Sequence, residues 1–443
     1  MSMFKKLLLI LFISPILLGA QHTISGTFTP GEDYQFAILY KVTPEASMFV
    51  ANTMIDDKGE FEFKLDSTVT EGMYKLVYAL PQSDYNFDII YNAKEDIALS
   101  FNAETGVKFT SSVENSLVNS YTGSMSLISQ SIGNFYRQQS ADTLALKAIF
   151  KTQSETQTEY EKAAEGTIAL NFIKANRPYI PDSFEDITTY ISNLKMHFFD
   201  HVDFNNSVLQ SSNFLIERLL NYVFGMAAKE GDEIASYKKN IDEVYQAMSE
   251  STLEMKRILL EVLWQQMVDT NFEEVANYIA EYYLLPVAES LNDQELISGL
   301  TIFKELSIGN RAPEFDVKIE ENGEMVDISL YDYNVARQYV VVFWSSGCSH
   351  CLEEIPQLHA YLKDNTNVKV IAVGMEDVTA PWELEVSKYP EFNHVLALGK
   401  WESELAKDYN ITSTPTYFVL SGDKKIVAKP FNFAGLKKYM EQR

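Results

Sequence analysis

The two cysteines of this sequence have a spacing that predicts chemistry. Cys348 and Cys351 are the only cysteines among 443 residues, and they form a C-x-x-C motif shortly after the apolar run 339–343. Such a run predicts a buried strand, so the motif stands where that strand would turn into a helix. A thiol at a helix N-terminus experiences the positive end of the dipole and free backbone N–H groups, which both favour the reactive thiolate. The sequence therefore predicts thiol–disulfide chemistry at this pair.

A metal site and an inert pair are the alternatives for two close cysteines. A structural zinc ion needs four ligands, commonly from two such pairs or from one pair and two histidines. The sequence has no second pair, and His350 and His359 are the imidazoles nearby. This shortage of ligands argues against zinc, and the surrounding motifs argue against an inert pair.

A second candidate metal motif, H-x-x-D-H, runs from His197 to His201. Two histidines four residues apart on a helix could bind one metal ion, with Asp200 as a base or Asp203 as a third ligand. The usual metalloprotease motif has Glu where Asp200 stands, and the phenylalanines nearby make a buried helix end equally natural. We therefore assign no metal ligand, and we expect no cofactor.

The last third of the chain contains four separate motifs. They are a tryptophan four residues before the first cysteine, an E-x-P sequence after the second, an entry segment G-x-x-A-P-x-F and a T-P loop. Their positions are Trp344, Glu354 with Pro356, 308–315 and 409–417. Together they resemble the exported TlpA/ResA-type thioredoxin-like proteins. The resemblance covers about residues 307–443 and implies a thioredoxin-like α/β fold there.

The two thiols have different expected roles. Cys348 would be the exposed nucleophile that caps the helix, and Cys351, one turn further in, would be the resolving thiol that releases a mixed disulfide. Ser349 and His350 lie between them. A protonated His350 would stabilise a neighbouring thiolate and make the disulfide more oxidising. The alternative is a solvent-exposed linker residue.

Glu354 is the expected proton-transfer group. It lies one turn beyond Cys351 and can share its helix face, and the resemblance implies that an acid here tunes the thiols and assists proton movement. Thioredoxins in general carry a buried acid where this sequence has Val342, which makes Glu354 the more plausible agent. An ordinary acidic residue in the first turn of a helix is the alternative.

The resemblance implies further support around the dithiol. A cis Thr414–Pro415 bond would pack against the thiols and present the Thr414 backbone to a substrate strand, although only about 5–6% of X–Pro bonds in folded proteins are cis. Trp344 is expected as a core aromatic, as a wall of the site, or as both.

The remaining sequence predicts a multidomain protein. Short β-rich runs separated by turn residues predict an all-β sandwich at 21–111, similar to the small module that often precedes such thioredoxin-like domains. Sparse Gly and Pro with apolar residues three and four apart predict an all-α domain at 112–306. The thioredoxin-like domain then occupies 307–443.

Residues 1–20 are predicted to be a cleaved secretory signal. Two lysines, Lys5 and Lys6, precede the apolar segment Leu7–Leu18, and Gly19 and Ala20 follow it. The apolar segment is short for a membrane helix, which needs about 20 residues, and an uncleaved anchor is the alternative. No cysteine follows the segment, so a bacterial lipoprotein is excluded. We therefore expect the protein in the periplasm.

The charge balance excludes one class of partner. The chain has 36 Lys and Arg against 62 Asp and Glu, a net charge of −26 at pH 7. Such acidity repels polyanions, so we expect no nucleic-acid binding.

These observations favour an exported thiol–disulfide oxidoreductase. We expect it to reduce disulfides of specific periplasmic proteins through Cys348 and Cys351, with a membrane thiol reductase as electron donor. A disulfide oxidase or isomerase is an alternative, as is an envelope ligand-binding protein in which the dithiol is auxiliary. A peroxidase is less favoured. Ser345 stands where the peroxidatic T-x-x-C pattern has Thr, but the Pro that precedes that pattern is absent here.

Overall fold

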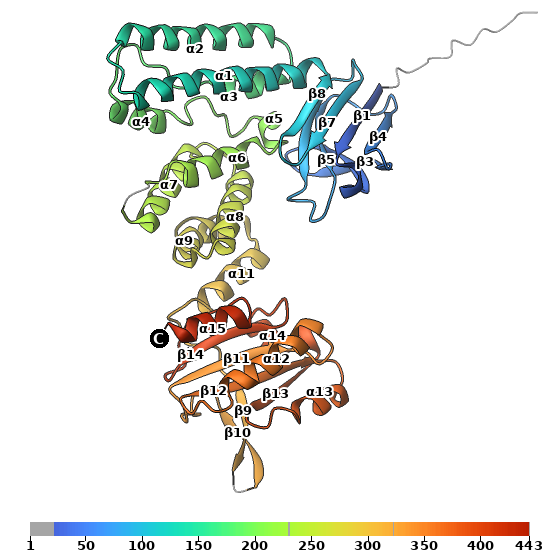
Figure 1. The fold of residues 1–443 in the computed structure, drawn as a ribbon, viewed down its shortest axis with the longest axis vertical. Helices are drawn as coiled ribbons and strands as arrows, with labels where there is room; N and C mark the ends of the chain where they lie inside the picture. The colour runs from blue at the N-terminus through green and yellow to red at the C-terminus, as the bar shows by residue number, and fades with distance from the viewer. Residues whose placement is uncertain (1–21, 229–230, 322, 443) are drawn as a thin grey trace, which may run out of the picture. The chain divides into compact units, whose positions relative to one another are not determined.

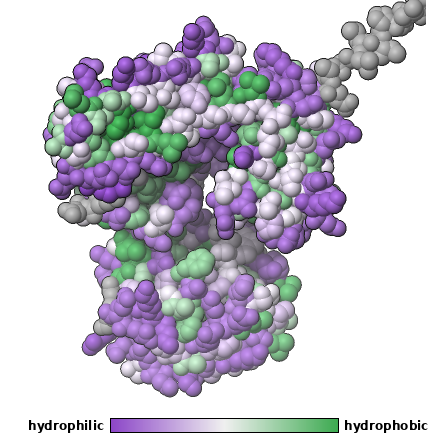
Figure 2. Space-filling view, turned by 45° about the horizontal axis from the view of Figure 1, so that its top comes forward, coloured by the Kyte–Doolittle hydropathy of each residue, from purple (hydrophilic) through white to green (hydrophobic). Residues whose placement is uncertain are grey.

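The computed structural model describes residues 22–228, 231–321 and 323–442 (Figure 1). The predicted signal at 1–20 lies outside these residues. The chain forms two compact units that divide between Gln265 and Gln266. Within the described ranges, no helix is long and apolar enough to cross a bilayer. Hydrophilic residues dominate the face shown in Figure 2, in keeping with the acidic composition.

The first unit begins with two four-stranded sheets. One sheet has the order β4-β1-β7-β8 and the other β3-β2-β5-β6. The strands are β1 (His22–Thr29), β2 (Phe36–Val42), β3 (Ser47–Met54), β4 (Glu60–Leu65), β5 (Gly72–Val77), β6 (Asn86–Tyr91), β7 (Ile97–Asn102) and β8 (Gly106–Ser111). Both sheets contribute to one apolar core, as β4 illustrates: Phe61, Phe63 and Leu65 are buried, whereas the residues between them are exposed. This period of two is that of a half-buried strand.

Helices make up the rest of the first unit. They are α1 (Val113–Arg137), α2 (Thr143–Ala163), α3 (Ala169–Ala175), α4 (Ile187–Met196), α5 (Ser207–Gln210), α6 (Phe214–Leu220) and α7 (Glu233–Ala247), followed by α8 (Leu253–Asp269), which spans the division between the units. Several begin at side chains that accept a free backbone N–H, such as Ser112 before α1 and Asp142 before α2. Helices α1 and α2 lie side by side (Figure 1), and the Tyr121 hydroxyl donates to Gln157 Oε1 at 2.7 Å.

The second unit is built on a five-stranded sheet of order β13-β12-β11-β14-β15. Its strands are β11 (Gln338–Trp344), β12 (Val368–Glu376), β13 (Asn393–Leu398), β14 (Thr416–Ser421) and β15 (Ile426–Ala428), preceded by a hairpin of β9 (Asp316–Glu321) and β10 (Glu324–Ser329). Its helices are α9 (Glu273–Ile279), α10 (Leu285–Leu291), α11 (Gln294–Glu305), α12 (Ser349–Leu362), α13 (Thr379–Val386), α14 (Glu404–Asp408) and α15 (Phe433–Glu441).

Strand β11 explains why the run before the cysteines is continuously apolar. Val340, Val342 and Trp344 face a core that includes residues of α12 and α15. The alternate residues Tyr339 and Phe343 face a second core on the other side of the sheet. A strand buried on both faces has no polar alternation, and Val342 is therefore an ordinary core residue.

The predicted boundary at 306/307 falls inside the second unit. Glu273 of α9 accepts the backbone N–H of Ile308 at 2.6 Å and forms an ion pair with Lys429. Asn277 donates to the Ser307 hydroxyl at 2.8 Å. The last helices of the segment 112–306 therefore pack with the C-terminal α/β domain, and sequence periodicity could not reveal this because these contacts are long-range.

Candidate dithiol active site

The dithiol lies where β11 ends and α12 begins. The loop after Trp344 turns through a hydrogen bond from the Cys348 N–H to the Ser345 carbonyl, at 3.1 Å. Cys348 is the N-cap of α12, and its sulfur accepts the Cys351 N–H at 3.2 Å. A thiol in this position takes the place of the usual capping oxygen. The position of the Cys348 thiol is therefore determined by the neighbouring strand β11 and by helix α12, which follows it.

The two thiols have different environments. Both are free, and Cys351 is fully buried whereas Cys348 is partly exposed. The Cys348 thiol donates to the Thr414 carbonyl at 3.4 Å. The Thr414–Pro415 bond is cis, as the resemblance implies. A partner molecule could therefore reach the sulfur of Cys348 but not that of Cys351.

The surroundings separate the acidities of the two thiols. Partial burial opposes ionisation of Cys348, but hydrogen bonds from Cys351, Thr414 and the His350 backbone outweigh it and lower its pKa. Burial raises the pKa of Cys351 to about 12, and its interaction with Cys348 adds to this rise. At neutral pH Cys348 is therefore the better nucleophile, and Cys351 keeps its proton.

Alkylation as a function of pH tests this separation. Because its pKa is lowered, Cys348 should show a half-maximal iodoacetamide rate at a pH below 9.0, the ordinary value of the thiol. Cys351 should resist modification until far higher pH. Mass spectrometry of the labelled peptides distinguishes the two sites, and glutathione in the same buffer serves as the reference thiol. A Cys348 profile centred above 9 would contradict the assignment.

Glu354 anchors two other elements of the domain. Its Oε2 accepts the Tyr417 hydroxyl at 2.8 Å and the Phe433 backbone N–H at 2.8 Å. It thus joins α12 to β14 and to the start of α15. Burial and the bond to Glu354 raise the pKa of Tyr417, and the nearby Cys351 contributes further. Tyr417 also belongs to the core cluster that contains Cys351. The sequence did not identify Tyr417, because its bond to Glu354 depends on how β14 packs against α12.

Glu354→Ala should destabilise the protein by about 2 kcal/mol. The fully buried Tyr417 hydroxyl and the Phe433 N–H would lose their acceptor, and an unsatisfied buried polar group costs about 1–3 kcal/mol. Urea unfolding followed by circular dichroism measures the change. Glu353→Ala is the matched control, because Glu353 is an exposed acid of the same helix. Equal stabilities of the two variants would show that Glu354 is not an anchor.

The other residues predicted near the dithiol are Ser349, His350 and Trp344. Ser349 and His350 are exposed, and the contribution of His350 to Cys348 comes from its backbone. Trp344 is completely buried and belongs to the same core cluster as Cys351, with Cys348 packed against it. Trp344 is therefore a core residue beneath the dithiol.

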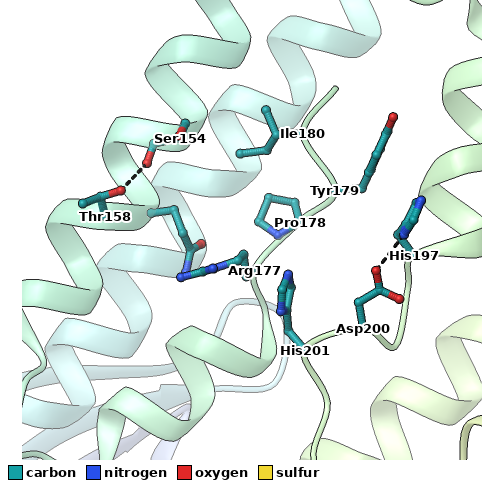
Figure 3. A pocket seen from close by; sticks show the side chains of 10 residues that line it. Ser154, Thr158, Arg177, Pro178, Tyr179, Ile180, His197, Asp200 and His201 are labelled. Carbon is teal, nitrogen blue, oxygen red and sulfur yellow. Dashed lines mark hydrogen bonds and ion pairs between the residues drawn. The ribbon is translucent and has the colours of Figure 1, made fainter. Parts of the chain in front are cut away.

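His197 and His201 do not lie on one helix, and the helix end that the neighbouring phenylalanines favoured is what the structure has. Helix α4 ends at Met196, and His197 is its C-cap. The His197 ring stacks on Tyr179 with centroids 4.8 Å apart, and its Nδ1 lies 2.6 Å from Asp200 Oδ2. Both histidines line a cavity of about 360 Å³ (Figure 3). Nowhere in the described part of the chain do three or more His, Cys, Asp or Glu side chains group as metal ligands.

A protein-family match covers the region that contains the dithiol. Residues 308–429 match the AhpC/TSA family. This region is a thioredoxin-like domain. The match covers Cys348 and Cys351 as well as the Thr414–Pro415 loop, and it leaves the N-terminal segments unassigned. No curated protein matches the chain.

Solved structures of Bacteroides proteins are similar to parts of the chain. The thioredoxin domain of a thiol-disulfide oxidoreductase from Bacteroides vulgatus is 27% identical, covering 31% of this chain and 97% of its own, with a TM-score of 0.26. A thiol-disulfide oxidoreductase from Bacteroides fragilis is 25% identical over 30% of this chain and 98% of its own, with a TM-score of 0.26. A thioredoxin-like protein from Bacteroides caccae is 18% identical over 60% of this chain and 97% of its own, with a TM-score of 0.34.

Proposed function

We propose that this protein is a thiol–disulfide oxidoreductase that reduces disulfides in partner proteins. The observation that carries the proposal is the asymmetry of the pair: Cys348 is partly exposed with a lowered pKa, and Cys351 is buried beside it with a raised one. Nucleophilic attack needs an accessible thiolate, and release of the product needs a second thiol within reach. The thioredoxin-like fold supports the same chemistry.

The reaction has two steps. The Cys348 thiolate attacks one sulfur of a substrate disulfide, forms a mixed disulfide and releases the other substrate sulfur as a thiolate. Cys351 then gives its proton to the substrate thiolate released in the first step and attacks Cys348, which forms the Cys348–Cys351 disulfide and releases the second substrate thiolate. The substrate gains two electrons and the dithiol loses two. An external dithiol reductant must restore the reduced pair.

The Thr414 carbonyl marks where a substrate would bind. It contacts the Cys348 sulfur at 3.4 Å and lies two residues before β14, which begins at Thr416. A substrate strand that paired with this backbone would bring its disulfide to the exposed side of Cys348. Main-chain pairing is tolerant of side chains, so it gives affinity without strong sequence selection. Other surfaces would have to supply selectivity for particular partners.

The direction, the compartment and the electron donor are parts of the same proposal. The sequence of residues 1–20 supports export to the periplasm, where a membrane thiol reductase would be the electron donor. Reduction is favoured over oxidation because the His350 side chain is exposed, so solvent weakens any stabilisation that it gives to the thiolate. An oxidase requires a strongly stabilised thiolate.

Single-turnover reduction of a model protein disulfide tests the proposal. The protein is reduced with dithiothreitol, freed of the reagent and mixed with an equal amount of oxidised insulin. We expect free insulin thiols to appear as the Cys348 and Cys351 thiols disappear in equal number. Insulin that stays oxidised while the protein keeps both thiols would overturn the proposed function.

A further inference from the structure

Glu376 is a buried acid of the C-terminal domain that belongs to none of the thioredoxin-like motifs. It is the last residue of β12, and its side chain is only 4% exposed. Strand β12 lies parallel to β11, with Gly374 opposite Trp344. Glu376 and Ser346 each lie two residues further along their segments, so they are level with one another. Ser346 belongs to the turn that leads to the dithiol.

A hydrogen bond joins Glu376 to that turn. The Ser346 backbone N–H donates to Glu376 Oε1 at 2.5 Å. The neighbouring residue Ser345 accepts the N–H of Cys348 at 3.1 Å, and its backbone also hydrogen-bonds to the Cys351 thiol. The carboxylate thus binds the segment that contacts both cysteines. It is a part of the site that the sequence did not reveal, because its only signal is an acid at the end of an apolar strand.

The burial of the Glu376 carboxylate is unusual. Glutamate is almost never fully buried unless it is paired, because burial disfavours its charge. Lys400 forms an ion pair with Asp377 at 2.9 Å and also interacts electrostatically with Glu376. The other acids of the site differ: Glu353 is exposed, and Glu354 is bound by Tyr417 and Phe433. Glu376 is therefore the buried acid whose direct contact is with the dithiol turn.

We propose that Glu376 is a positioning residue of the dithiol, which holds the turn before Cys348 and opposes formation of the Cys348 thiolate by its buried negative charge. The inference rests on the proposed function. A nearby negative charge disfavours a thiolate. A pair whose thiolate is less stable is a stronger reductant, because the reduced form is then less favoured. Glu376 would thus keep the pair reducing even though hydrogen bonds and the helix terminus act in the opposite direction.

The charge and the hydrogen bond can be separated by substitution. Glu376→Gln keeps the shape and an oxygen that can accept the Ser346 N–H, but removes the charge. We expect the pH midpoint of Cys348 alkylation to fall, so that the rate below the midpoint rises about three- to tenfold. At pH values above that midpoint, the equilibrium with glutathione should shift about tenfold towards the dithiol, or about 30 mV. Glu376→Asp keeps the charge and should remain close to the wild-type protein in both measurements.

The controls exclude a general effect of surface charge. Glu353→Gln removes an exposed acid that is closer in sequence to Cys351, and it should leave both measurements unchanged. Thermal unfolding is recorded for each variant. If Glu376→Gln does not fold, Lys400→Gln replaces it: loss of the cation that faces Glu376 should raise the midpoint.

Three outcomes would overturn the inference. The first is an alkylation midpoint and a glutathione equilibrium of Glu376→Gln equal to those of the wild-type protein. The second is a shift of Glu376→Asp as large as that of Glu376→Gln, which would assign the effect to geometry alone. The third is an unchanged midpoint in Lys400→Gln, where that variant is used. Failure of the proposed function would be seen separately, as a wild-type pair that does not cycle.

Discussion

Cys348→Ser should abolish reduction of a protein disulfide, whereas Cys351→Ser should leave the protein covalently attached to its substrate. The first variant lacks the partly exposed thiol with the lowered pKa, and the remaining thiol is fully buried, which raises its pKa. The second variant can still attack a disulfide through Cys348, but it has no thiol to resolve the product. We therefore expect a loss of at least about a thousandfold in single-turnover rate for Cys348→Ser.

Non-reducing electrophoresis and mass spectrometry identify the mixed disulfide. With Cys351→Ser and oxidised insulin, we expect an adduct at Cys348 that dithiothreitol releases. The double variant with both serines is the control and should form no adduct. Wild-type activity in Cys348→Ser would contradict the assignment of the nucleophile, and an adduct on Cys351 in that variant would reverse the two roles.

Gly374→Ala should strongly destabilise the C-terminal domain. A Cβ at this position of β12 would lie 2.1 Å from Trp382 Nε1 and 2.5 Å from Cδ1 of the same indole. These separations are far inside van der Waals contact, so the ring or the strand must move. Overpacking of a core costs about 1–3 kcal/mol and occasionally more, and we expect about 3 kcal/mol here because a rigid ring faces a central strand. Urea unfolding measures the change.

Two further variants identify the cause. Trp382→Ala removes the ring, so adding Gly374→Ala to that background should cost much less than it does in the wild-type protein. Gly299→Ala is the matched control: Gly299 lies in α11 with open space around it, and alanine there should be neutral or slightly stabilising. Equal costs of Gly374→Ala with and without Trp382 would show that the indole is not what excludes the methyl group.

Local patterns predicted the parts of the site that are close in sequence. The apolar run 339–343 and the C-x-x-C motif indicate a strand followed by a helix, and the structure has β11, a turn and α12 there. The capping position of Cys348 follows from the same local order. The cis Thr414–Pro415 bond could not come from local physics, because most X–Pro bonds are trans, and it was expected only from the resemblance.

Contacts between segments that are distant in the chain could not be predicted from the sequence. Tyr417 reaches Glu354 only because β14 pairs with β11, and Glu376 reaches Ser346 only because β12 lies parallel to β11. Both depend on strand order and register, which a period of apolar residues does not fix. The expectation for Glu354 named the residue but not the two donors that occupy its carboxylate.

The segment that starts at His197 shows how tertiary packing overrides a periodic pattern. Histidines four residues apart suggested one helical face, but α4 ends before them. The aromatic rings of Phe198 and Phe199 pack against Tyr222, at 5.1 and 4.8 Å between centroids. These contacts suit a turn that leaves the helix axis. The aromatic residues that made a helix end an equally natural alternative are therefore the ones that stabilise the turn.

The reduction potential of the Cys348–Cys351 pair tests the central claim most directly. The full chain is equilibrated with graded ratios of reduced and oxidised dithiothreitol or glutathione, and its free thiols are trapped and counted by mass. We expect a single two-electron transition near the potential of thioredoxin, about −270 mV. A transition near −120 mV, the range of the strongest dithiol oxidants, would contradict a reductase and favour an oxidase or isomerase. A pair that shows no transition would contradict the redox role itself.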